Sequence, residues 1–260
     1  MRAGAQTLYG STSSGHGELY ILNPATGGVI QDVGALNDSS ANNYSVTGLA
    51  FDPLTGVLYG STGGVSGTRL LTINPATGLV NVVGSFGVGS ATMTDLAFDQ
   101  AGNLYGISSS GGANLYSINP GTGAATAIGS SGVSFTESGG LAISSSDIFY
   151  GAPIPGDYGT YNPTTGVYTQ ITAPATPAGA GSSYAALAFD GLVFYGDNLV
   201  AGGSGVTHLV TIDPSGNVTD IGASVTHLDA IAFAPVPEPG TMTLLLGAGA
   251  MALLTIRRRK

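Results

Sequence analysis

Residues 49–60 read LAFDPLTGVLYG, two short apolar segments on either side of a turn sequence. Asp52-Pro53-Leu54-Thr55-Gly56 places a proline, whose fixed φ suits the second position of a turn, before a glycine that tolerates a positive φ. The aspartate side chain is also suited to accept hydrogen bonds from the turn backbone. This stretch therefore predicts two antiparallel strands, LAFD and LYG, joined by a tight turn.

The same pattern recurs along the chain, and such repetition is the strongest clue to its architecture. The motif LYG or FYG has its tyrosine at Tyr9, Tyr59, Tyr105, Tyr150 and Tyr195, with spacings of 50, 46, 45 and 45 residues. The LAFD-like strands are GLAFD (48–52), DLAFD (95–99), GLAIS (140–144), ALAFD (186–190) and AIAFA (230–234).

Two more strands complete each unit. One ends in Asn-Pro or Asp-Pro, as in LYILNPATG (19–27), and the next closes on Gly in four copies, as in VIQDVG (29–34). A unit of roughly 45 residues with four short antiparallel strands has the size of a propeller blade. We therefore expect residues 1–235 to form an all-β domain, a β-propeller of about five four-stranded antiparallel blades.

The order of strands within a blade also follows from the pattern. The LAFD strand is short, apolar and rich in small residues, as the crowded axis of a ring requires, so we place it innermost. The LYG strand, the Asn-Pro strand and the Gly-ending strand then follow outward. The chain begins with an LYG strand and ends with an LAFD-like strand, so the two ends should pair and close the ring. Six or seven blades remain open if residues precede Met1.

The repeats resemble the LAFDP…LYG…INPATG units of bacterial propellers grouped with NHL-type and YVTN-type repeats. The resemblance spans residues 7 to 234. It implies a propeller architecture and leaves the function open.

The last 25 residues, VPEPGTMTLLLGAGAMALLTIRRRK (236–260), have a different composition. Pro237-Glu238-Pro239 precedes an uncharged apolar stretch, residues 241–256, and the chain ends in Arg257, Arg258, Arg259 and Lys260. As a helix, those 16 residues would extend about 24 Å, somewhat less than a hydrocarbon core of about 30 Å. We expect a short transmembrane helix whose basic end stays in the cytoplasm.

This tail resembles the PEP-CTERM sorting signal of exported bacterial proteins. The resemblance implies that an exosortase, a membrane protease-transpeptidase, recognises Pro237, Glu238 and Pro239 and processes the tail. It also implies a membrane-anchored intermediate, followed by the cell surface or an exopolysaccharide matrix. The domain organisation expected from the sequence is thus a propeller at 1–235 and a sorting tail at 236–260.

Charge limits the partners of this protein. The formal net charge is −9, yet four of the six cations are the last four residues, so residues 1–256 carry only Arg2 and Arg69 against 15 acids. Such a body repels phosphate backbones and makes nucleic acid an unsuitable partner. There is no cysteine, which excludes disulfides and thiol chemistry.

The start of the chain does not match this expected destination. MRAGAQTLYG has one cation and no apolar core of seven or more residues, so it is no signal peptide. Because a sorting tail requires export, we expect the natural N-terminus to lie upstream of Met1.

Candidate site residues are few. Asp52, Asp99 and Asp190 end three LAFD strands on one face of the ring, where they are candidate ligands for a cation such as calcium, although capping of their own turns is the favoured interpretation. Ser144 and Ala234 interrupt that ring of acids. No calcium-loop motif, phosphate-binding loop or nucleophile elbow occurs.

Other residues are weaker candidates. His208 and His227 lie in one copy and His16 lies in a Gly-rich loop, and a partly exposed structural role is favoured for them. Glu137 and Asp157 are acids in irregular loops with nothing to single them out. The repeated tyrosines are expected to pack between blades.

The sequence favours an exported binding or structural module without catalytic residues. The alternative is an extracellular propeller enzyme, a hydrolase or lyase of polysaccharides or lactones that uses acids near the axis. That alternative requires non-equivalent polar residues to converge at one mouth of the ring, and the copies look too alike to favour it.

Overall fold

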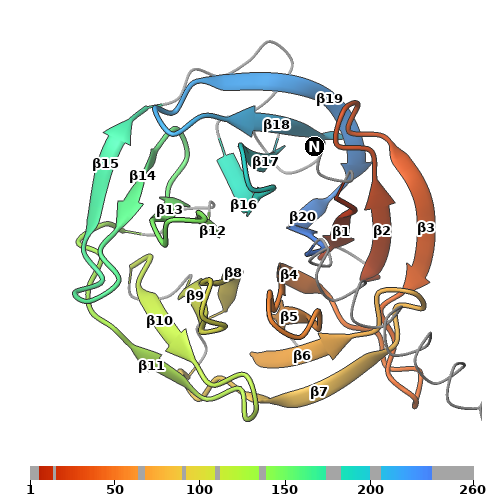
Figure 1. Cartoon of the computed structure of the whole chain (residues 1–260). Coiled ribbons are helices and arrows are strands. Elements are labelled where there is room, and N and C mark those ends of the chain that lie inside the picture. The colour runs from red at the N-terminus through yellow and green to blue at the C-terminus, as the bar shows by residue number, and fades with distance from the viewer. Residues whose placement is uncertain are drawn as a thin grey trace, which may run out of the picture.

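Five antiparallel sheets of four strands each surround a common axis in the computed structural model (Figure 1). The residues described are 6–13, 16–63, 68–89, 92–108, 112–134, 139–173, 183–199 and 206–235. Within them, every regular element is a strand, and the predicted five-bladed propeller is confirmed.

Each blade runs from an inner strand at the axis to an outer strand at the rim, in the predicted order. Blade 1 consists of β20 (Leu228–Phe233), β1 (Leu8–Thr12), β2 (Glu18–Leu22) and β3 (Val29–Ala35). Blade 2 consists of β4 (Val46–Phe51), β5 (Leu58–Thr62), β6 (Arg69–Ile73) and β7 (Val80–Ser85). Blade 3 consists of β8 (Met93–Phe98), β9 (Leu104–Ser108), β10 (Leu115–Ile118) and β11 (Ala125–Ala127). Blade 4 consists of β12 (Gly140–Ile143), β13 (Phe149–Ala152), β14 (Tyr158–Tyr161) and β15 (Tyr168–Thr172). Blade 5 consists of β16 (Ser183–Phe189), β17 (Phe194–Leu199), β18 (Val206–Ile212) and β19 (Val218–Thr226).

The ring is closed by its two chain ends, as the sequence predicts. β20 pairs with β1 in antiparallel register, with Leu8 opposite Phe233 and Gly10 opposite Ile231. One more backbone hydrogen bond, from Ala234 N to Thr7 O at 2.9 Å, extends this pairing beyond the strands. Blade 1 is thus assembled from residues more than 200 positions apart in the sequence.

The Asn-Pro turns form as their residues dictate. Asn23 Oδ1 accepts a hydrogen bond from Ala25 N at 2.9 Å, and Asn23 O accepts one from Gly27 N at 2.8 Å. Gly27 has φ 75°, a conformation that a side chain would strain. The same bonds recur at Asn74 and Asn119, so a local five-residue signal fixes the outer hairpin of successive blades.

Aromatic pairs cover the seams between blades, and the tyrosine prediction is confirmed. The rings of Tyr9 and Phe51 join blades 1 and 2 with centroids 5.4 Å apart, and Tyr195 and Phe233 join blades 5 and 1 at 4.9 Å. In blade 4, Ile143 takes the place of the inner-strand phenylalanine, and Tyr105 packs on Phe149 of β13 instead.

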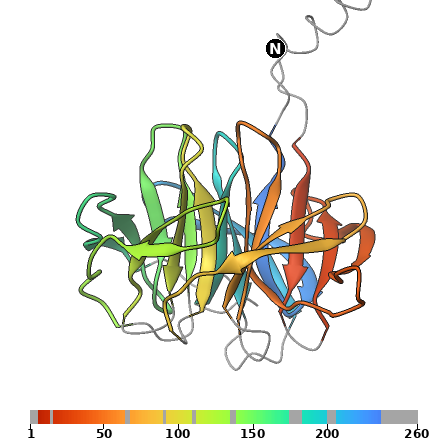
Figure 2. The same ribbon diagram turned by 90° about the horizontal axis from the view of Figure 1, so that it is seen from below.

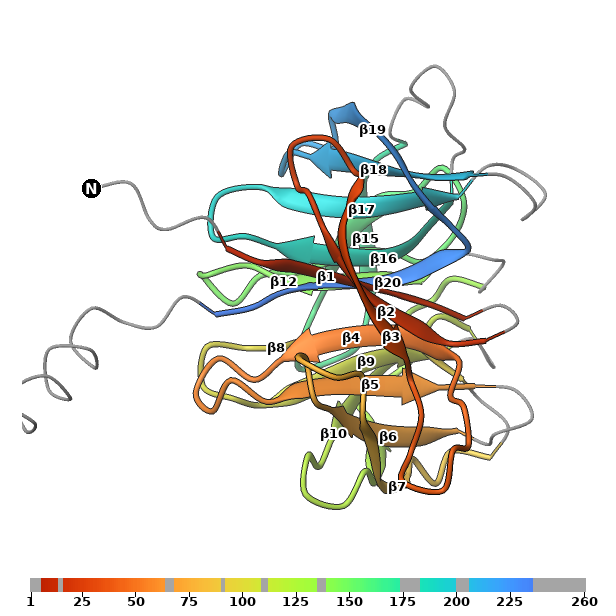
Figure 3. The same ribbon diagram turned by 90° about the vertical axis from the view of Figure 1, so that its right-hand side faces the viewer.

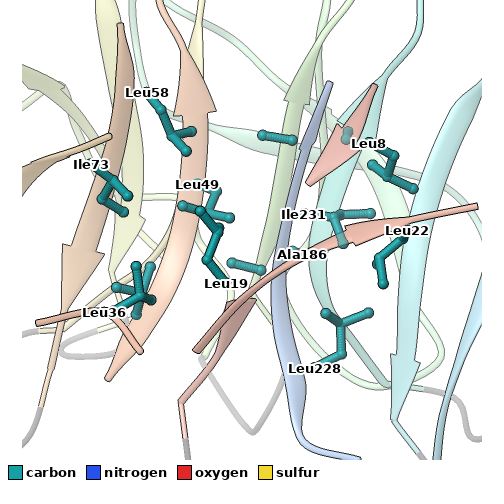
Figure 4. Packing of buried hydrophobic residues seen from close by; sticks show 14 of the residues in the cluster. Leu8, Leu19, Leu22, Leu36, Leu49, Leu58, Ile73, Ala186, Leu228 and Ile231 are labelled. Carbon is teal, nitrogen blue, oxygen red and sulfur yellow. The ribbon is translucent and has the colours of Figure 1, made fainter. Parts of the chain in front are cut away.

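Buried leucines fill the space between the sheets beside these pairs. Figure 4 shows Leu8, Leu22 and Leu228 of blade 1 in one cluster with Leu49 and Leu58 of blade 2. The core therefore lies between blades, and each sheet depends on its neighbours for burial.

The ring has two distinct faces (Figures 2 and 3). Inner strands end on the face where the described chain begins and stops, near Thr7 and Pro235, and we call this the tail face. The turns from inner to second strands lie there as well. The opposite face carries the segments that enter each inner strand.

The predicted transmembrane helix 241–256, the sorting motif and the basic end all fall outside the described residues. Among the residues that are described, no helix is long and apolar enough to cross a membrane.

Candidate functional site: acids at the ring axis

The inner strands leave a narrow central channel with a pocket of about 100 Å³. Three consecutive residues from each inner strand line it, and the middle one is always alanine, which lets the five strands approach the axis. The lining residues are Leu49–Phe51, Leu96–Phe98, Leu141–Ile143, Leu187–Phe189 and Ile231–Phe233. This part of the channel carries no ionisable side chain.

Asp52, Asp99 and Asp190 lie on the tail face, where each accepts hydrogen bonds within its own turn. Asp52 Oδ1 accepts from Leu54 N at 2.8 Å, and Asp52 Oδ2 accepts from Thr55 Oγ1 at 2.7 Å. Asp99 accepts from Ala101 N, Asn103 N and Asn103 Nδ2, and Asp190 accepts from Leu192 N and Val193 N. These bonds are the capping role that the sequence favours, and a calcium role for the three acids stays an untested prediction.

Asp95, by contrast, is a fully buried acid at the axis. Its Oδ1 accepts from Leu96 N at 2.8 Å, and its Oδ2 accepts from Leu141 N at 2.8 Å and Leu187 N at 3.0 Å. One carboxyl group therefore joins the inner strands of blades 3, 4 and 5. Burial raises the pKa of Asp95, and the three amide donors oppose that rise.

Asp197 on β17 is a second fully buried acid. Its Oδ1 accepts from Ala186 N at 2.6 Å, beside the place where the register between β16 and β17 shifts. Its Oδ2 has no hydrogen-bond partner among the described residues. Burial raises the pKa of Asp197, and the nearby charges of Asp229 and Asp95 raise it further.

Asp229 on β20 is a third acid at this end of the channel, and it is partly exposed. The pairing of β1 and β20 skips it, since Thr12 pairs with Leu228 and Ser11 with Ala230, so Asp229 is the extra residue of a β-bulge. Burial raises its pKa to about 6, while the Ser13 hydroxyl and His227 oppose the rise.

Asp95, Asp197 and Asp229 lie near one another at the end of the ring axis opposite the tail face, where the inner strands begin, and we call these three acids the acid mouth. Each breaks the repeat. Asp95 stands where other copies have Gly48, Gly140, Ala186 or Ala230, and Asp197 stands where they have Ser11, Ser61, Ile107 or Ala152.

The residues that the five copies share do not reveal this site, because the three acids stand at positions where the copies differ. Aligning the five copies at these positions would have shown three acids without counterparts. Three non-equivalent acids near one another are the feature that the enzyme alternative requires, and whether they catalyse a reaction stays an untested prediction.

A family model described as a repeat of unknown function (DUF6923) matches residues 31–188, more than half of the 260-residue chain. The chain belongs to the DUF6923 repeat family. The matched region runs from β3 to β16, so it covers blades 2, 3 and 4 entirely. A second model, the PEP-CTERM protein-sorting motif, matches residues 235–260 and confirms the predicted sorting tail.

Solved structures share the fold of this DUF6923 protein at low sequence identity. A chain in a nidogen/laminin complex is 13% identical, with a TM-score of 0.54 over 89% of this chain and 98% of that chain. A protein of unknown function from Bacteroides caccae is also 13% identical, with a TM-score of 0.54 over 89% and 99%. A Bacteroides thetaiotaomicron protein of unknown function is 15% identical, with a TM-score of 0.52 over 83% and 64%. No curated protein matches. These likenesses establish the fold alone.

The other candidate residues that the sequence suggested in this DUF6923 protein do not lie together at the acid mouth. His208 Nδ1 lies 3.0 Å from Asp220 Oδ1 on the neighbouring strand β19, near the rim. His227 links β19 to β20 with φ 60°, and His16 is exposed. Asp157 is buried, which raises its pKa, and Glu137 lies outside the described residues. In the described part of the chain, no group of three His, Cys, Asp or Glu residues is arranged to hold a metal ion.

Proposed function

We propose that this protein is exported and sorted by an exosortase to the cell surface or the exopolysaccharide matrix, where its ring serves as a binding or structural module. The match to the sorting motif supports delivery, and the closed ring supports a module with a large exposed surface. The association with exopolysaccharide comes from the resemblance to PEP-CTERM proteins.

The observation that carries the proposal is that the last paired residue of the ring comes directly before the sorting motif in the sequence. The closing strand β20 ends at Phe233, the last backbone bond belongs to Ala234, and the matched sorting motif begins at residue 235. Processing at Pro237-Glu238-Pro239 would therefore remove no strand and break no pairing of the described residues. A ring released in this way keeps its complete fold.

In the proposed route, residues 241–256 hold the protein in the membrane while the four terminal cations stay in the cytoplasm. Exosortase then acts on the proline-rich motif outside. The apolar stretch is short for a permanent anchor, which fits a transient one.

The test is the double variant Pro237→Ala/Pro239→Ala in a strain that possesses an exosortase. We expect the variant to accumulate as the unprocessed, membrane-held form, detected by its size and by cell fractionation. Pro214→Ala, at an exposed turn of the ring, is the matched control and should be processed normally. Normal processing of the double variant would refute the exosortase route.

An extracellular hydrolase or lyase remains the second candidate, because the acid mouth brings together three acids that the repeat does not require. Asp229 is its best candidate acid or base, since its side chain is partly exposed and burial raises its pKa to about 6. Turnover of polysaccharides or lactones that is lost in Asp229→Asn would favour the enzyme. Glycan binding without turnover would favour the binding module.

A further inference from the structure

Hydroxyl groups hold the seams between blades at the entrance to the inner strands. Thr47, the bulge residue of β4, donates from Oγ1 to Met93 O of the next blade at 2.8 Å. Ser61 Oγ donates to the same carbonyl oxygen at 2.9 Å. Thr94, the bulge residue of β8, donates to Gly139 O of the following blade at 3.2 Å.

The two seams of blade 1 each carry an acid in one of these places. At the seam with blade 2 the acid lies beside a hydroxyl group, since Ser11 Oγ donates to Val46 O at 3.5 Å. Asp229 is the bulge residue of β20 and corresponds to Thr47 and Thr94, so its counterpart acceptor is Val46 O in blade 2. Asp197 follows the glycine of FYG and corresponds to Ser61, so its counterpart acceptor is Leu228 O in blade 1. A hydroxyl group always has a proton to donate, whereas a carboxyl group has one only when it is protonated.

The surroundings of the acid mouth favour the protonated form of its carboxyl groups, above all that of Asp197. Asp197 Oδ2 is buried without a hydrogen-bond partner among the described residues, which is costly for an ionised carboxylate. Asp95 uses both oxygens as acceptors, so it is the acid best suited to carry the charge. Arg69 is the one Lys or Arg within the described residues, and it lies exposed on β6, the third strand of blade 2.

We propose that the acid mouth is a proton-dependent lock of the ring. Protonated Asp197 takes the place of Ser61 as donor to blade 1, and protonated Asp229 takes the place of Thr47 as the second donor, beside Ser11, to blade 2. Together they hold blade 1 to its two neighbours. The lock is closed at acidic pH and loosens when Asp229 ionises. This inference stands independently of the proposed function.

Burial of Asp229 sets the direction of the effect, because it raises the pKa of that carboxyl group. Asp197 on β17 and Asp95 on β8 are the acids that face it, and His227 and the Ser13 hydroxyl are the groups that stabilise its ionised form. The pKa of Asp229 is about 6 in the folded protein, above the ordinary aspartate value of 3.8. The folded state therefore binds more protons than the unfolded state between these values, so stability decreases as pH rises through about 6.

The experiment is thermal unfolding of the full chain in mild detergent with EDTA, between pH 4.5 and 7.5. The wild type should lose stability as pH rises through about 6. Asp229→Thr introduces the threonine that blades 2 and 3 carry at this position. Its unfolding temperature should vary less across this window and exceed that of the wild type at pH 7.5. Asp197→Asn keeps a neutral donor and should fold with near wild-type stability.

The matched control is Asp32→Asn on the exposed strand β3, which removes the same charge and should keep the wild-type pH profile. It accounts for the general change in net charge near the isoelectric point of 4.3. Identical pH profiles for the wild type and Asp229→Thr would overturn the proposal.

A divalent cation is the competing occupant, and it requires ionised acids. If calcium raised the unfolding temperature of the wild type but not of Asp197→Asn, the lock would be refuted. Infrared difference spectra provide a readout that does not depend on stability, because a protonated Asp197 contributes a carboxylic C=O band that Asp197→Asn lacks. Absence of that band at pH 5 would also overturn the proposal.

Discussion

Asp95 shows how one side chain at the axis can replace missing backbone pairing. Inner strands have no neighbour on their axial side, so their amides need other acceptors. The carboxyl group of Asp95 supplies them to Leu96, Leu141 and Leu187, from three successive blades. This arrangement explains why a buried acid is stabilising here despite the cost of its burial.

Asp95→Ala should therefore be strongly destabilising, since it leaves three buried N–H groups without an acceptor. At about 1–3 kcal/mol for each unsatisfied group, we expect a loss of several kcal/mol. Asp95→Asn should lose less, because its Oδ1 can still accept from Leu141 and Leu187. Urea unfolding of the two variants measures this order, and a loss below about 0.5 kcal/mol for Asp95→Ala would contradict it.

At the scale of elements, the inner strands β4 and β8 approach so closely that there is no room for a side chain at one of their contacts. A Cβ placed on Gly48 of β4 would lie 2.6 Å from Asp95 Cα and 2.9 Å from Asp95 C on β8. Backbone atoms cannot move aside as a flexible side chain can. Glycine at position 48 is therefore required by the close spacing of β4 and β8.

Gly48→Ala should cost about 1–3 kcal/mol because it forces β4 and β8 apart. Gly28→Ala is the matched control, since the nearest atom to its added Cβ is Thr26 Oγ1 at 3.5 Å and its φ is not positive. That control should be neutral or slightly stabilising. Denaturant midpoints of both variants check the difference, and equal midpoints would show that the inner strands can separate at little cost.

The strands also show which parts of the structure could be predicted from the sequence and which could not. Blade number, strand order and ring closure follow from LAFD, LYG and the Asn-Pro turns, because each is a local signal repeated at a constant spacing. The acid mouth does not follow from such signals. Asp229 reaches the axis through a bulge, and register shifts depend on pairing between distant strands. Asp95 and Asp197 lie in different blades, and only the closed ring brings them near one another.

For the whole molecule, the position of both chain ends on the tail face has a consequence for orientation. If residues 241–256 cross the membrane and the tail continues directly from Pro235, the tail face must lie toward the bilayer. The acid mouth then points away from it. A ligand or a change of pH outside the cell would reach the acid mouth without passing the membrane.

This orientation can be tested because the chain has no cysteine. Ser145→Cys places a thiol in a turn of the tail face, and Ser134→Cys places one in the segment between β11 and β12 on the opposite face. Both serines are exposed, so the two variants differ chiefly in their face.

In the membrane-held Pro237→Ala/Pro239→Ala form, a bulky polymer-linked maleimide should label Ser134→Cys faster than Ser145→Cys. Detergent solubilisation removes the bilayer and should bring the two rates together, which excludes local differences in thiol reactivity. Equal labelling rates in the intact membrane would mean that the tail face of the ring is not held toward the bilayer. The acid mouth would then have no preferred direction relative to the bilayer.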